Sequence, residues 1–128
     1  DLMHTKPREA FMSKNYPELT SDLSQSLKLL RQEIPETMQA FGALAQAATK
    51  DGVLDKKTKE LIALALGVAA RCDGCIGFHG ETLVKLGATR QEVLETLAMA
   101  VYMGGGPSLM YAADAIKAFA QYQEKAAA

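Results

Sequence analysis

Strand-forming residues are scarce in this chain. Of its 128 residues, valine and isoleucine together supply only 9, whereas alanine and leucine supply 37. Alanine and leucine lose little side-chain freedom in a helix, whereas β-branched side chains favour strands. The composition therefore predicts an all-α fold.

Several other features are missing, and each absence excludes a class of protein. The sequence has only two cysteines, too few for a disulfide scaffold. Its net charge of -1 gives no basic footprint for nucleic acid. The longest apolar run, Leu61–Ala70, is about half the length that a membrane span requires, and no basic-then-apolar signal pattern opens the chain. We therefore expect a cytoplasmic protein with neither nucleic-acid nor membrane partners.

Helical periodicity and capping signals predict about six helices in one domain, residues 21–128, preceded by an N-terminal arm or short helix over residues 1–20. The third helix is apolar on nearly every face, so we expect it to be buried. Gly87 and the run Gly104–Gly106 are expected to end helices. The predicted helices span residues 21–34, 35–50, 56–70, 71–86, 90–103 and 107–125.

Two thiols and an imidazole recur at helical spacing. Cys72 and Cys75 are one turn apart, and His79 follows one turn later on the same face. One turn separates Cα atoms by about 5–6 Å, a distance that a disulfide can bridge. A position at a helix N-terminus also favours the thiolate over the thiol. The spacing therefore predicts a reactive dithiol that can cycle to a disulfide.

Glu60 is the fourth candidate residue. It lies on the preceding predicted helix, and an antiparallel return after Arg71 could bring its carboxylate beside Cys75 or His79. A carboxylate beside apolar residues is costly without such a partner. In the alternative interpretation, Glu60 is a solvated acid of the first helical turn and His79 is a polar surface residue.

The Cys-x-x-Cys pair alone allows three interpretations: a structural thiol pair, half of a metal site or a redox couple. A tetrahedral zinc site needs four ligands, and this motif supplies only three: Cys72, Cys75 and His79. His4 in the predicted arm is a poor fourth ligand, so we expect no metal. No βαβ pattern surrounds the motif, which argues against a thioredoxin fold.

Four segments in combination resemble the alkylhydroperoxidase D and carboxymuconolactone decarboxylase family. They lie within the stretch from about Ile34 to Phe119. The combination of a glutamate twelve residues before Cys-x-x-Cys and a histidine four residues after it is specific to this family. The segments are Asp51–Leu61, Arg71–His79, Gly87–Thr89 and Met103–Pro107.

This resemblance implies an all-helical oligomer that acts as a thiol-dependent peroxidase or disulfide reductase. It implies that Cys75 attacks a hydroperoxide, that Cys72 is the more exposed resolving sulfur, and that Glu60 and His79 relay protons. It implies no bound cofactor and an external dithiol reductant, either a lipoyl group or a small redox protein. The family's best-known peroxidase has a histidine where this chain has Gly74, so the relay here is shorter.

Other functions remain open on the sequence alone. One is a disulfide reductase that meets no peroxide. A second is the lyase activity of the decarboxylase branch, although that branch lacks the cysteine pair. A third is a redox-responsive oligomeric binding module without turnover. Steady-state consumption of hydroperoxide with a regenerating dithiol separates the enzyme from the binding module.

A homo-oligomer is expected because six short helices cannot easily cover the apolar surface of this chain. The family resemblance implies a trimer or a hexamer, with Cys72 facing a cleft shared between subunits. Methionine and tyrosine suit such interfaces. The predicted contact is the final helix, Pro107–Phe119, together with Met99, Tyr102 and Met103.

Overall fold

The computed structural model describes residues 14–128, which form six α-helices and no strand. The all-α prediction is confirmed. Residues 1–13, which include His4 and most of the predicted arm, lie outside the described residues. The helices are α2 (Tyr16–Glu33), α3 (Pro35–Thr49), α4 (Lys56–Ala69), α5 (Asp73–Lys85), α6 (Arg90–Gly104) and α7 (Gly106–Ala127).

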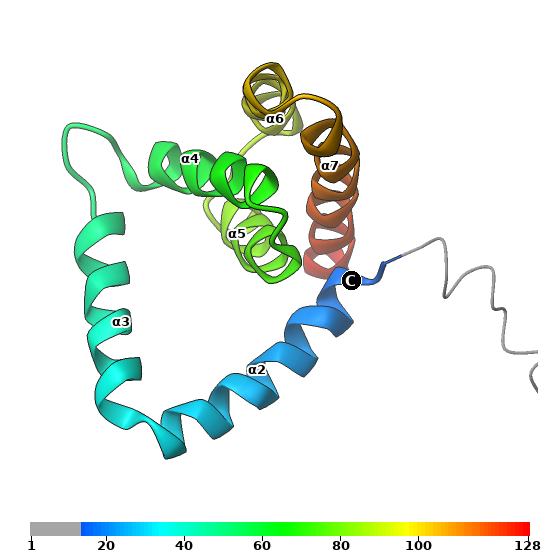
Figure 1. Cartoon of the computed structure of the whole chain (residues 1–128). Helices are drawn as coiled ribbons and strands as arrows, with labels where there is room; N and C mark the ends of the chain where they lie inside the picture. The colour runs from blue at the N-terminus through cyan, green and yellow to red at the C-terminus, as the bar shows by residue number, and fades with distance from the viewer. Residues whose placement is uncertain (1–13) are drawn as a thin grey trace, which may run out of the picture.

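Helices α4 to α7 enclose the hydrophobic core (Figure 1). α4 packs against α5 and α6, and α7 packs against the same two helices. Large side chains from all four helices are fully buried there. The apolar faces that the periodicity predicted are thereby shielded from water. They include Leu64, Val68, Ile76, Leu83, Val93 and Phe119.

The first described helix begins at Tyr16, five residues earlier than the sequence analysis predicted. Asn15 caps it, because its side-chain oxygen accepts a hydrogen bond from the backbone N–H of Glu18 at 3.0 Å. Pro17 fits the first turn, where a backbone N–H has no helical partner. The predicted cap at Ser21 is therefore wrong: this residue lies inside α2.

The start of α2 is anchored to the core. Tyr16 and Thr20 are buried, and the Tyr122 hydroxyl of α7 contacts both. Its oxygen lies 3.1 Å from the Tyr16 carbonyl oxygen and 2.5 Å from the Thr20 hydroxyl. Burial raises the pKa of Tyr122 above its ordinary value. These contacts hold α2 against α5 and α7, next to the start of α5.

Beyond this anchor, α2 and α3 form a helical extension that leaves the α4–α7 core and returns to it through the loop before α4 (Figure 1). α3 has no buried residue. Its apolar face, predicted from Met38, Phe41, Ala45 and Ala48, is present but uncovered, with Phe41 65% exposed. A short isolated helix is marginal in water, and α3 gains little support from burial within its own chain.

The remaining connections follow their capping signals. Thr89 and Glu92 form the predicted capping box of α6, in which each side chain accepts a hydrogen bond from the other's backbone N–H. Gly87 and Gly105 adopt φ values of 76° and 71°, which glycine tolerates without strain. Gly105 alone separates α6 from α7, so the glycine run is a tight interhelical turn.

Two packing predictions require correction. α4 is not buried on every face, because Ile62 and Leu66 are exposed. In the predicted subunit contact, Met99, Tyr102 and Met103 are exposed, but Phe119 belongs to the core of its own chain. Periodicity identifies apolar residues but not which neighbour covers them.

Among residues 14–128, every helix is too short or too polar to cross a membrane.

Candidate active site

A buried carboxylate and an imidazole form the inner part of the candidate site. Asp55 caps α4 by accepting a hydrogen bond from the Thr58 N–H at 2.8 Å. Glu60 lies one turn into this helix. Glu60 is only 4% exposed. Its Oε1 lies 2.6 Å from Nδ1 of His79 on α5, whose side chain is 32% exposed. The burial of Glu60 rules out the alternative of a solvated first-turn acid.

The two cysteines lie at the start of α5. Cys72 is the N-cap residue, and Cys75 lies in the first turn. They form a disulfide with a Cα–Cα distance of 5.2 Å, as the one-turn spacing predicted. The Cys72 sulfur also accepts a hydrogen bond from the Cys75 N–H at 3.1 Å. The chain can therefore hold this pair as a disulfide within one helical turn.

Gly67 brings α4 close to the cysteines. A Cβ atom at this position would lie 3.0 Å from the Cβ of Cys75, which is too close for an unstrained contact. Because α4 and α5 run antiparallel, Gly67 meets Cys75 while Glu60, two turns earlier, meets His79. Gly67 was not among the predicted site residues. Its signal was a single glycine within an apolar helix.

Gly74 lies close to a leucine of α2. A Cβ atom there would lie 2.8 Å from Cδ1 of Leu23 on α2. Leu23 thus occupies the space beside the Cys-x-x-Cys turn where a side chain at position 74 would begin. An apolar side chain therefore lies next to Gly74, between the two cysteines in the chain.

A group of charged residues surrounds the first turn of α5. Lys14 binds Asp73 at 3.0 Å and Asp114 of α7 at 2.9 Å, and its Nζ lies 5.2 Å from the centroid of the Tyr111 ring. Partial burial lowers the pKa of Lys14, but the hydrogen bonds to Asp114 and Asp73 outweigh this effect and hold it above its ordinary value. Lys14 was not among the predicted site residues, because nothing in the chain order connects it with Asp73.

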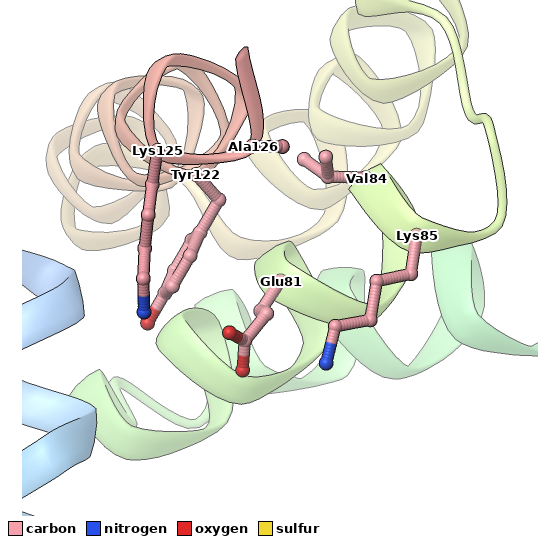
Figure 2. Close-up of a pocket in the computed structure, with 6 residues that line it drawn as sticks. All are labelled: Glu81, Val84, Lys85, Tyr122, Lys125 and Ala126. Carbon is pink, nitrogen blue, oxygen red and sulfur yellow. The ribbon is translucent and has the colours of Figure 1, made fainter. Parts of the chain in front are cut away.

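A separate cavity of about 190 Å³ lies between α5 and α7 (Figure 2). Figure 2 shows Tyr122 and Lys125 of α7 facing Glu81 and Lys85 of α5. At 1.5 Å per residue, Lys85 lies roughly 15 Å along α5 from Cys75. None of the four predicted site residues lines this cavity.

Within residues 14–128 there is no group of three or more His, Cys, Asp or Glu side chains that could hold a metal ion. His4, the weak fourth ligand considered above, lies outside the described residues. The four predicted site residues form two pairs: the Cys72–Cys75 disulfide at the start of α5, and the hydrogen bond between Glu60 of α4 and His79 of α5.

The fold and these two pairs define an all-helical protein with a Cys-x-x-Cys disulfide at the start of one helix and a buried carboxylate that is hydrogen-bonded to a partly exposed imidazole of the same helix. The chain belongs to the carboxymuconolactone decarboxylase family, whose model matches residues 35–118. The family identified from the sequence motifs is thus confirmed.

Relatives extend the match beyond the family segment. An uncharacterised protein of Cupriavidus necator is 41% identical over 77% of this chain and 88% of its own length. A carboxymuconolactone decarboxylase family protein of Legionella pneumophila, solved in its apo form, is 64% identical with a TM-score of 0.84, covering 87% of this chain and 99% of that one.

A family protein of Thermotoga maritima is 28% identical, with a TM-score of 0.74 over 82% of this chain and 90% of that one. A role in the antioxidative response has been suggested for the Thermotoga protein. The fold thus extends across relatives of quite different sequence.

Proposed function

We propose that this protein is a thiol-dependent peroxidase and disulfide oxidoreductase that reduces hydroperoxides through Cys72 and Cys75. The observation that carries the proposal is the disulfide at the start of α5, on the helix whose His79 is hydrogen-bonded to buried Glu60. The role suggested for the Thermotoga relative adds support. The decarboxylase alternative has no comparable observation in its favour.

The first chemical step uses Cys75. Glu60, directly or through water and His79, accepts the thiol proton, and the thiolate attacks the O–O bond of the hydroperoxide. A sulfur–oxygen bond forms and the O–O bond breaks, so Cys75 becomes a sulfenic acid and the leaving alkoxide takes a proton to become an alcohol. Sulfur loses two electrons, and the peroxide gains them.

The second step uses Cys72. Its sulfur attacks the Cys75 sulfenic acid, forms the disulfide and releases water. An external dithiol then exchanges with this disulfide, restores both thiols and leaves as its own disulfide. A lipoyl group or a small redox protein would supply these electrons, and no cofactor need stay bound.

We also propose that a second copy of this chain covers the exposed apolar faces. One such face is α3, where Phe41 and Leu44 are 65% and 62% exposed. Another is at the end of α6, where Tyr102 is 78% exposed beside Met103. Helix α3 carries a single charge, Glu36, in 15 residues, which suits burial between subunits better than contact with water. A trimer or hexamer would place the disulfide in a cleft near a subunit boundary.

Steady-state turnover tests the proposed activity. Purified protein is mixed with cumene hydroperoxide and a panel of regenerating donors: dihydrolipoamide with its reductase, and thioredoxin with its reductase. We expect continuous consumption of hydroperoxide with at least one donor, and none from the Cys72→Ser or Cys75→Ser variants. Reduction of the disulfide by a donor without hydroperoxide consumption would leave a disulfide reductase and refute the peroxidase.

A further inference from the structure

Arg71, the residue before Cys72, has a backbone conformation that is rare for its type. Its φ is 57°, and it is the only non-glycine residue with a positive φ among residues 14–128. The other two positions of this kind are occupied by Gly87 and Gly105. L side chains adopt this left-handed conformation only against a steric penalty, because Cβ approaches the following carbonyl oxygen.

The conformation is imposed by the end of α4. The Arg71 N–H donates to the Val68 carbonyl oxygen at 3.1 Å, and the Cys72 N–H donates to the Gly67 carbonyl oxygen at 3.0 Å. This pair of bonds is the common helix-ending motif whose left-handed residue is usually glycine. Stability alone would therefore favour glycine at position 71, yet the chain places an exposed cation there, directly before a disulfide cysteine.

The charged group at the first turn of α5 carries an excess of carboxylates. Lys14 is paired with two carboxylates, Asp73 and Asp114, which leaves that group one negative charge in excess. Among residues 14–128, the exposed Arg71 side chain forms no salt bridge, so no single carboxylate neutralises its charge, and Arg71 lies two residues before Asp73 in the chain. Without Arg71, a net negative charge would remain beside the Cys72 sulfur and would disfavour both a thiolate and an approaching anion.

Cys72 is also placed to carry a negative charge. Its sulfur already accepts a hydrogen bond from the Cys75 N–H at the start of α5, an arrangement that stabilises a thiolate. In exchange with a dithiol, the donor's thiolate bonds to the Cys72 sulfur, and the electron pair of the broken disulfide goes to Cys75, which takes up a proton. The donor's second thiolate then attacks its own bound sulfur and releases Cys72 as a thiolate.

We propose that Arg71 is a specificity residue, which stabilises the Cys72 thiolate and favours redox partners with a negative charge next to their reacting sulfur. The inference rests on the proposed exchange between Cys72 and an external dithiol. It explains why a strained arginine occupies a position suited to glycine, since only a cationic side chain offsets the excess of carboxylates.

Three matched disulfides test the proposal on the full chain. Dithiodipropionate is anionic, hydroxyethyl disulfide is neutral and cystamine is cationic, but all three have similar size. Reduced wild-type protein, Arg71→Lys, Arg71→Ala and Arg71→Gly are mixed with each, and loss of the Cys72 thiol is followed by peptide mass. We compare the rate of exchange with the anionic disulfide to the rate with the cationic one. At a partly exposed site, one charge near the Cys72 sulfur changes this ratio by about tenfold.

We expect this ratio to fall about tenfold in Arg71→Ala and Arg71→Gly and to be kept in Arg71→Lys. Because glycine relieves the strain and alanine does not, Arg71→Gly should melt about 3 °C above Arg71→Ala. An unchanged ratio in the two uncharged variants would overturn the proposal, as would an equal fall in Arg71→Lys. These exchange rates need no peroxide, so a protein without hydroperoxide turnover that still shows the expected ratios would refute the peroxidase and leave this inference standing.

Discussion

Replacement of Glu60 by glutamine removes a carboxylate from the proposed relay and keeps the side chain's shape. The amide can still pair with His79 across the 2.6 Å separation of Glu60 Oε1 and His79 Nδ1. It cannot accept the Cys75 proton. Loss of a general base typically slows a reaction by 10²–10⁴-fold, and we expect about 100-fold here, because His79 is partly exposed and water can replace some of the relay.

The effect on folding should be small by comparison. A hydrogen bond to a charged group stabilises by roughly 1 kcal/mol more than a neutral one, but a buried amide costs less to desolvate than a buried carboxylate. We therefore expect the melting temperature to change by less than about 4 °C. A large rate loss without unfolding separates a chemical role for Glu60 from a structural one.

Stopped-flow measurement of Cys75 oxidation by cumene hydroperoxide provides the assay. Glu95→Gln on α6 is the matched control, since Glu95 is exposed and lies on a different helix. His79→Ala should slow oxidation less than Glu60→Gln but destabilise the fold more, by about 2 kcal/mol, because it leaves the buried carboxylate without its partner. If the two residues act as one relay, the double variant is no slower than Glu60→Gln. A wild-type oxidation rate in Glu60→Gln would refute the relay.

Three further outcomes are expected. With hydroperoxide, Cys72→Ser should trap Cys75 as a sulfenic acid detectable by dimedone labelling, whereas Cys75→Ser should leave Cys72 largely unlabelled; the reverse pattern would exchange their roles. Light scattering at micromolar concentration should report at least three chains, and Phe41→Glu should reduce that number, whereas a wild-type monomer of about 14 kDa would contradict the proposed interface. Because burial raises the pKa of Tyr122, the unfolded chain releases its proton first, and stability should fall above a pH of about 10. Thermal melts from pH 8 to 11 should show a smaller alkaline loss in Tyr122→Phe; an identical loss would place its cause elsewhere.

The sequence predicted much of the fold because its signals are local. The capping box at Thr89 and the glycine turn at Gly105 depend on residues within a few positions of each other, and both are confirmed. The one-turn spacing of Cys72 and Cys75 is local in the same sense, and their Cα distance follows from helix geometry. The start of α2 was missed because Asn15 was not considered as a cap.

Features that depend on tertiary contacts could not be predicted in the same way. Periodicity marked the apolar face of α3 but could not show that the chain leaves Phe41 uncovered. The close approach at Gly67 and the link from Lys14 to Asp73 join residues of different elements, whose distance depends on the packing of whole helices. The pairing of Glu60 with His79 was expected because an antiparallel return of α5 along α4 is the simplest path for a short turn.

A single-turnover reaction between fully reduced protein and one equivalent of cumene hydroperoxide tests the central claim most directly. The products are counted after the hydroperoxide is consumed: cumyl alcohol by chromatography, free thiols by titration and the disulfide by peptide mass. We predict one alcohol formed and two thiols lost per chain, with the bond between Cys72 and Cys75 and a mass lower by two hydrogens than that of the reduced chain. Disulfide formation without a matching amount of alcohol, or hydroperoxide that stays unconsumed while both thiols remain, would contradict the account.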